Sequence, residues 1–84
     1  MTSPTAGTLA ETRIYVIIPV LNEAAAIDRV VQEIPDRLVD DIVVVNNGST
    51  DETAHVAEKA GAVVIDEERR GYGWACLRGI DYIK

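Results

Sequence analysis

Two apolar segments that end abruptly in polar residues constrain the fold of this 84-residue chain more than any other feature. Residues 14–18 (IYVII) run into PVLNE, and residues 42–45 (IVVV) run into NNGSTD. Short, continuous, β-branched runs are typical of strands buried on both faces of a parallel sheet. Neighbouring parallel strands form a crevice at their carboxyl ends, where open α/β sheets bind ligands. The two segments therefore predict a ligand site on identifiable loops.

Size and charge narrow the class of protein. A chain of 84 residues makes one domain at most. The net charge of −6 disfavours binding to nucleic acid or to an anionic membrane. No apolar stretch approaches the about 20 residues of a transmembrane helix. Cys76 is the only cysteine, which excludes a disulfide framework and fits a cytoplasmic location. We expect residues 1–12 to form a flexible arm and residues 13–84 to form the domain.

Three strand-like runs alternate with three helix-like patterns, the third run being residues 62–65. This order predicts an α/β fold: a three-layer parallel sheet of three β-α units, one half of a Rossmann-like doubly wound domain. We expect the first helix to begin near Asn22 and to stop before Pro35. For the second, Ser49 and Glu52 have capping-box spacing, and Gly61 is placed to end it. The third should begin after Gly73, with an inner face of Cys76, Leu77, Ile80 and Ile83.

Each loop at a strand end admits a functional and a purely structural interpretation. Asn22 and Glu23 offer acceptors at the crevice, or they cap a helix. In the second loop, Gly48 permits positive φ and the following helix start offers N–H groups to an anion or polar ring. A turn does not explain two consecutive asparagines there, which favours a binding role. In the third loop, the arginines at 69 and 70 suit a phosphate or the edge of a base, or they pair with neighbouring acidic residues.

Several nucleotide and hydrolase motifs are absent from the sequence. There is no GxGxxG after the first strand, no GxxxxGK[ST] and no GxSxG. His55 is the only histidine, which excludes a cluster of histidine metal ligands.

The motifs VIIPVLNE, IVVVNNGSTDET and RGYGWACLRGI together resemble the N-terminal part of a family 2 inverting glycosyltransferase with the GT-A fold. The resemblance covers about residues 13–84. The third motif is similar to the branch that includes polyprenyl-phosphate sugar synthases. The resemblance implies a site for a nucleotide-diphospho-sugar, with a UDP-sugar favoured over a GDP-sugar.

Roles for individual residues follow from the resemblance alone. It implies that the nucleoside pocket is formed by residues from all three loops: Pro19, Leu21, Glu23, Val45, Asn47, Gly48, Arg70, Gly71 and Gly73. Asn47 would face the N3 edge of a pyrimidine, and Asp51 would steady its loop. The pair of asparagines departs from the Asp-Asp pair commonest in the family, and an amide can donate as well as accept.

The family places its metal-binding Asp-x-Asp motif and its catalytic base beyond the equivalent of Lys84. We therefore assign no catalytic residue and no metal ligand here, and expect Mg²⁺ or Mn²⁺ only for the complete domain. The predicted reaction is transfer of a sugar to an acceptor such as a polyprenyl phosphate or a glycan, with the parent enzyme at the cytoplasmic face of a membrane as one option. The alternatives are a truncated, inactive chain that at most binds nucleotide and self-associates through an exposed sheet edge, and a nucleotidyltransferase of related fold.

Overall fold

A three-stranded parallel sheet forms the centre of the molecule. The structure, a computed structural model, describes residues 13–84, so the predicted arm at residues 1–12 lies outside it. The strands are β1 (Tyr15–Val20), β2 (Asp41–Asn46) and β3 (Val63–Asp66), in the order β1-β2-β3. Val20 pairs with Asn46 and Asn46 pairs with Asp66, so all three strands end at one edge of the sheet. The predicted α/β fold with a parallel sheet is confirmed.

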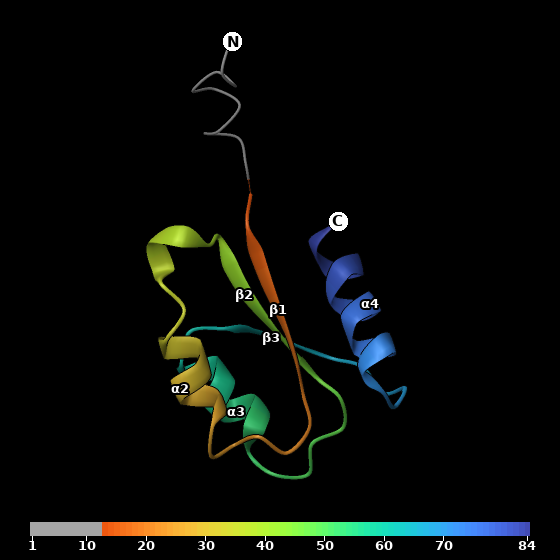
Figure 1. Ribbon diagram of the computed structural model, residues 1–84. Helices are drawn as coiled ribbons and strands as arrows, with labels where there is room; N and C mark the ends of the chain where they lie inside the picture. Colours follow the sequence, from red (N-terminus) through yellow and green to blue (C-terminus); the bar gives the residue numbers. More distant parts are fainter. Residues whose placement is uncertain (1–12) are drawn as a thin grey trace.

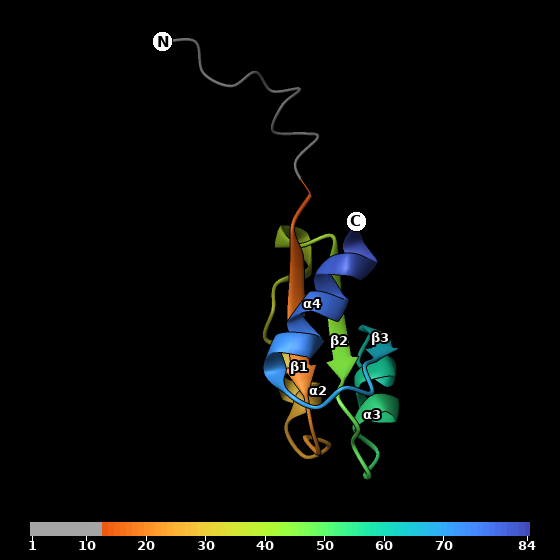
Figure 2. The same cartoon turned by 90° about the vertical axis from the view of Figure 1, so that its right-hand side faces the viewer.

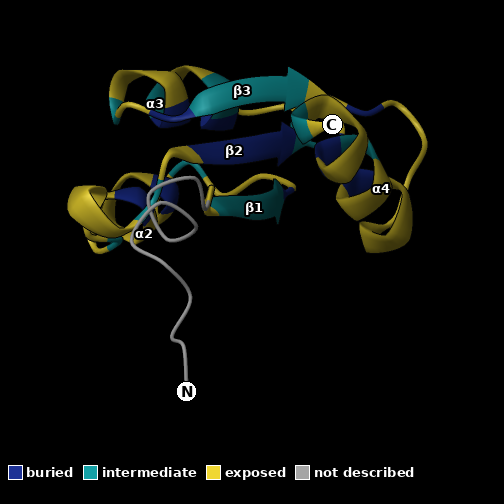
Figure 3. Cartoon of the chain, turned by 90° about the horizontal axis from the view of Figure 1, so that it is seen from above, coloured by how far each residue is buried: buried dark blue, intermediate teal, exposed yellow. Residues whose placement is uncertain are grey.

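Helices cover both faces of the sheet, as Figures 1 and 3 show. Helices α2 (Ile27–Gln32) and α3 (Thr53–Lys59) lie on one face, and α4 (Tyr72–Ile83) lies on the other. The short 3-10 turn η1 (Asp36–Leu38) leads from α2 to β2. Figure 2 shows α4 running along β1 and β2.

The central strand β2 is buried on both faces, as its sequence predicts. Side chains alternate across a strand, and Ile42 and Val44 pack into the cluster on the side of α2 and α3. Val43 and Val45 pack instead against Ala75 of α4. The two hydrophobic clusters thus pack on opposite faces of β2 and hold in place the point at which the loop after it begins.

The predicted starts of the first two helices are wrong. Helix α2 begins at Ile27 rather than near Asn22, which has a left-handed φ of 55°. Helix α3 begins at Thr53, and no side chain of Ser49 or Glu52 forms the predicted capping box. Both loops are longer because Asn22 and Ser49 bond across to the other loop instead of capping the helix that follows each of them. Gly61 follows Ala60, the C-cap residue of α3, and has a φ of +105°, as expected for the glycine that ends this helix.

The predicted inner face of α4 is wrong at three of its four positions. Cys76, Leu77 and Ile80 are exposed, whereas Ile83 is half-buried and packs against the core as predicted. The buried residues of the helix are Ala75 and Gly79. A Cβ placed on Gly79 would lie 2.5 Å from Cγ2 of Ile17. The helix packs closely on β1 through its smallest residues, so its larger apolar side chains point outward. It begins at Tyr72, earlier than predicted.

Within residues 13–84, no helix is long and apolar enough to cross a membrane. In this sheet β1 and β3 each have one unpaired side among the described residues. Self-association through such an edge stays a prediction.

Candidate functional site

A hollow of about 230 Å³ lies at the carboxyl ends of the strands. It is lined by residues from all three loops: Val20, Leu21, Asn47, Arg70, Gly71 and Tyr72. Four of these, namely Leu21, Asn47, Arg70 and Gly71, are among the predicted site residues. The strand ends are aligned by the register of the sheet, which is why loops about 25 residues apart in sequence meet here.

Two other predicted residues border a neighbouring hollow. Pro19 and Glu23 line a space of about 210 Å³ together with residues of α2. Val20 borders both hollows, so the two adjoin at the end of β1. The structure therefore places the predicted residues of the first loop around two adjoining spaces.

The remaining predicted residues differ in their access to the hollow. Gly48 has a φ of +90°, a conformation that favours glycine, and a Cβ there would be in ordinary contact with Nε of Arg70 at 3.4 Å. Val45 is fully buried, and its side chain is not available to a ligand in this structure. Gly73 lies in the first turn of α4 and lines neither hollow.

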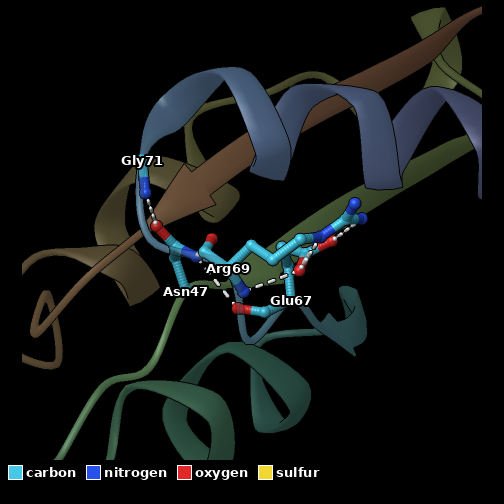
Figure 4. A network of polar contacts seen from close by, with 4 residues as sticks. All are labelled: Asn47, Glu67, Arg69 and Gly71. Atoms are coloured by element: carbon cyan, nitrogen blue, oxygen red, sulfur yellow. Dashed lines mark hydrogen bonds and ion pairs between the residues drawn. The ribbon is translucent and has the colours of Figure 1, made fainter.

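Asn47 connects the end of β2 to the loop after β3, as Figure 4 shows. Its Nδ2 donates to the backbone oxygens of Glu67 at 2.9 Å and Arg69 at 2.7 Å. Its Oδ1 accepts from the backbone N of Gly71 at 2.9 Å. The side-chain orientation follows from these partners, because carbonyls only accept and an N–H only donates.

These bonds determine what Asn47 can offer to a ligand. A side-chain amide has two donor hydrogens and two acceptor positions. Both hydrogens and one acceptor position are used by the loop. One acceptor position on Oδ1 is left, so Asn47 can accept a hydrogen bond from a ligand in the hollow but cannot donate one without releasing the loop.

The two arginines of the third loop have different environments. Arg69 is held by Glu67, whose carboxylate accepts from the Arg69 side chain at 2.8 and 3.0 Å and from its backbone N at 2.7 Å. These contacts lower the pKa of Glu67 to about 2. The Arg69 guanidinium also lies 3.9 Å from the centre of the Trp74 ring. Arg70 instead lines the hollow, where it is the one cationic residue of the described lining. Of the two interpretations drawn from the sequence, Arg69 therefore follows the one in which it pairs with a neighbouring acidic residue.

The N–H groups expected to be open at the start of α3 are engaged by side chains. Thr50 N and Asp51 N donate to Oδ1 of Asn22, and Thr53 N donates to Oδ1 of Asp51. The Thr53 hydroxyl also donates to Asp51, and this contact is the main cause that lowers the pKa of Asp51. Asp51 steadies its own loop, while the expected anion site at these three groups is not present.

Among residues 13–84, no three His, Cys, Asp or Glu side chains lie close enough together to hold a metal ion.

Three residues that organise the site were not identified as such from the sequence: Asn22, Thr53 and Glu67. Thr53 is fully buried, and its Oγ1 accepts from the backbone N of Glu23 at 2.8 Å. The D-x-T spacing of residues 51 and 53 was the available signal for that threonine. Glu67 lies between two other acidic residues, and no sequence pattern distinguishes it from them.

Comparison with known proteins identifies the class to which this fold and site belong. Residues 15–84 match the family described as glycosyl transferase family 2, and the chain belongs to that family. An uncharacterised glycosyltransferase of Mycobacterium tuberculosis is 40% identical over 72 residues, covering 86% of this chain and 32% of the relative. The 4,4'-diaponeurosporenoate glycosyltransferase of Staphylococcus aureus is 39% identical over 74 residues, covering 80% of this chain and 20% of the relative. The chain thus spans about a third or less of the length of these relatives.

Solved structures with the same fold include a sugar-nucleotide complex. Glucosyl-3-phosphoglycerate synthase of Mycobacterium tuberculosis, in complex with Mn²⁺, UDP-glucose and glycerol 3-phosphate, has a TM-score of 0.77 and 33% identity. The match covers 98% of this chain and 35% of that protein. The same enzyme in complex with UDP has a TM-score of 0.76.

Proposed function

We propose that this chain binds the nucleotide part of a UDP-sugar within a family 2 glycosyltransferase. The observation that carries the proposal is that Asn47 lines the hollow at the strand ends and keeps one acceptor position on Oδ1 that the loop bonds leave unused. Uracil presents an N–H at N3, whereas cytosine presents a lone pair at the same position. An acceptor that cannot donate therefore favours uracil over cytosine. The similarity to a synthase solved with UDP-glucose supports the same nucleotide.

Roles can be proposed for the surrounding residues. Leu21 would contact the base beside Asn47, and Gly71 would bring backbone close to it. Arg70, the cation of the lining, would contact the diphosphate. Pro19 and Glu23 would meet the ribose in the adjoining hollow. Val45 would act only by supporting the end of β2 from within the core, and Gly48 by allowing the positive φ that its loop requires.

None of the residues described here is proposed to carry out the chemical step of sugar transfer. The proposed reaction is displacement at the anomeric carbon of the sugar, with the nucleoside diphosphate as leaving group. The role of this chain in it is to hold and orient the leaving group. A polyprenyl phosphate or a glycan is the proposed acceptor, the former on the resemblance of the third motif. Family membership separates the chain from nucleotidyltransferases, and a cytoplasmic location stays a prediction.

Titration calorimetry with UDP, CDP, GDP and ADP tests the proposal. We expect UDP to bind and CDP to bind at least about tenfold more weakly, because its N3 lone pair would oppose the Asn47 oxygen. Guanine also carries an N–H on its pairing edge, so stronger binding of GDP than UDP would reassign the donor to a GDP-sugar. Equal affinities for UDP and CDP, or no binding of any nucleotide at millimolar concentration, would refute the proposed site.

A further inference from the structure

Asn22 adopts an unusual backbone conformation at the end of β1. It is the one non-glycine residue with positive φ in the part of the chain that the structure describes, with a φ of 55°. Asparagine tolerates this region better than most residues, but a left-handed residue still costs backbone energy. Such conformations persist where the surrounding structure fixes them, and they are frequent at functional sites. The contacts of Asn22 show what fixes it.

The side chain and backbone of Asn22 bond to the loop after β2. Its Oδ1 accepts from the backbone N of Thr50 at 2.8 Å, and from the Thr50 hydroxyl and Asp51 N at 3.3 Å each. Its own backbone N donates to Oγ of Ser49 at 2.9 Å. The oxygen of one side chain thus serves three donors from a loop 28 to 29 residues further along the chain.

The next two residues continue the same connection. The backbone N of Glu23 donates to Thr53 at 2.8 Å, and that of Ala24 donates to Asp51 at 3.3 Å. The first two loops are therefore joined along their length, chiefly by side chains bonded to backbone. Asn22 is the only residue of this connection that both has a left-handed backbone conformation and accepts hydrogen bonds from the other loop.

Asn22 lies between two residues of the proposed nucleotide site. Leu21 lines the hollow that contains Asn47, and Glu23 lines the adjoining one. We propose that Asn22 is a positioning residue for nucleotide binding: it holds Leu21 and Glu23 in place relative to Asn47, without contacting the nucleotide. This inference rests on the proposed function, and it assigns to Asn22 a role other than the helix cap or ligand acceptor expected from the sequence.

Three substitutions separate the backbone contribution of Asn22 from that of its acceptor. Asn22→Asp retains the acceptor oxygen and a residue that tolerates the left-handed region. Asn22→Gly retains access to that region but removes the acceptor. Asn22→Ala removes both. Gln32→Ala, which shortens an exposed amide at the end of α2, is the matched control.

Affinity for UDP should depend on whether the side chain at position 22 retains its acceptor oxygen. We expect Asn22→Asp to stay within about threefold of the unaltered chain, and Asn22→Gly and Asn22→Ala to bind at least about tenfold more weakly. Gln32→Ala should bind as the unaltered chain does. Each titration is run well below the unfolding midpoint of that variant, so that lost stability does not enter the affinity. If Asn22→Ala fails to fold, the contrast between the Gly and Asp variants decides.

Hydrogen exchange gives a readout that does not depend on nucleotide. The amides of Thr50 and Asp51 should be protected in the unaltered chain and in Asn22→Asp, and should exchange faster in Asn22→Gly. A Gly variant that loses this protection yet binds UDP as tightly as the unaltered chain would overturn the positioning role. Unchanged protection would overturn the loop connection itself. If the unaltered chain binds no nucleotide, the proposed function and the affinity claim fail together, and the exchange contrast still decides whether Asn22 joins the loops.

Discussion

Oδ1 of Asn47 accepts a hydrogen bond from the backbone N of Gly71, across 24 residues of sequence. The opposite end of the same amide holds the backbone oxygens of Glu67 and Arg69. Asn47 is therefore a structural residue of the third loop as well as a lining residue of the hollow. The side chain of Asn47 thus determines where the third loop, which includes Arg70, lies at the hollow.

Asn47→Asp should loosen the third loop. A carboxylate oxygen would replace the Nδ2 donor opposite two carbonyl oxygens, leaving buried acceptors unpaired at a cost of about 1–3 kcal/mol. Trp74, the only tryptophan of the chain, stacks on Arg69 next to this loop and reports on it by fluorescence. We expect Asp at position 47 to increase quenching of Trp74 by acrylamide and to lower the unfolding midpoint.

The neighbouring asparagine provides the control for this experiment. Asn46 donates to the exposed carboxylate of Asp66 at 3.2 Å, and its side chain holds no part of residues 67–71. Asn46→Asp should therefore leave the quenching of Trp74 unchanged. Equal responses of the two variants would contradict a specific role of Asn47.

Arg70→Ala should weaken binding of UDP roughly ten- to hundredfold, the equivalent of one charge-assisted hydrogen bond. The loss for uridine, which lacks the diphosphate, should be much smaller. Arg69→Ala is the comparison, because Arg69 is engaged by Glu67 and Trp74 and should affect stability more than affinity. Calorimetry with both ligands measures the difference, and equal losses for UDP and uridine would place Arg70 away from the phosphates.

Gly79→Ala should destabilise the protein although alanine is the better helix former. The new Cβ would lie 2.5 Å from Cγ2 of Ile17, a branched side chain on β1 that cannot move aside freely. We expect a loss of about 1–3 kcal/mol in the free energy of unfolding.

Gly73→Ala in the same helix is the matched control, because its Cβ would meet nothing within 4 Å. There we expect a gain of up to about 1 kcal/mol. Urea unfolding followed by circular dichroism measures both variants, and a stabilising Gly79→Ala would show that α4 does not pack against β1 this closely.

Glu67 should contribute stability that depends on pH. Its pKa in the folded chain is about 2, below the ordinary 4.5, because Arg69 donates to the ionised form. A depressed pKa stabilises the fold above about 4.5, and the contribution is lost as the pH falls from there through about 2. Glu67→Gln should therefore unfold at a lower temperature than the unaltered chain at neutral pH, with the gap narrowing in strong acid.

Glu68→Gln tests whether that behaviour belongs to Glu67. Glu68 is an exposed neighbour, and no side-chain hydrogen bond is found for it in the structure of residues 13–84. Its substitution should leave the difference between neutral and acid unfolding temperatures unchanged. The ion pair would be contradicted if the difference in unfolding temperature between Glu67→Gln and the unaltered chain stayed constant from neutral pH to strong acid.

Strand positions could be predicted from the sequence because burial on both faces leaves a continuous β-branched run, as in residues 42–45. The inner face of α4 could not be found in the same way. A search for large apolar residues selects Leu77 and Ile80, whereas close packing on β1 selects Ala75 and Gly79. The sequence pattern that does indicate this face is the spacing of Ala75 and Gly79 by four positions.

For the loops, the residues at the site could be predicted, but the hydrogen-bond partners of their side chains could not. The resemblance to family 2 glycosyltransferases implied that Leu21, Asn47, Arg70 and Gly71 share one site, and in the structure these residues line one hollow. The partners of the loop side chains were not predictable, because an asparagine can cap its own helix or bond to another loop with equal chemistry. The parallel register decides between these options at Asn22, since it places the end of β1 beside the end of β2.

The bonds of Asn47 also imply an order of folding. Its partners lie 20, 22 and 24 residues away in sequence, so closing these bonds costs loop entropy, and we expect them to form once β2 has paired with β3. The ion pair between Glu67 and Arg69, only two residues apart, needs no such assembly. The third loop should therefore acquire its local shape early and reach its place over the hollow late, and binding of the proposed nucleotide would then appear only after the sheet is complete.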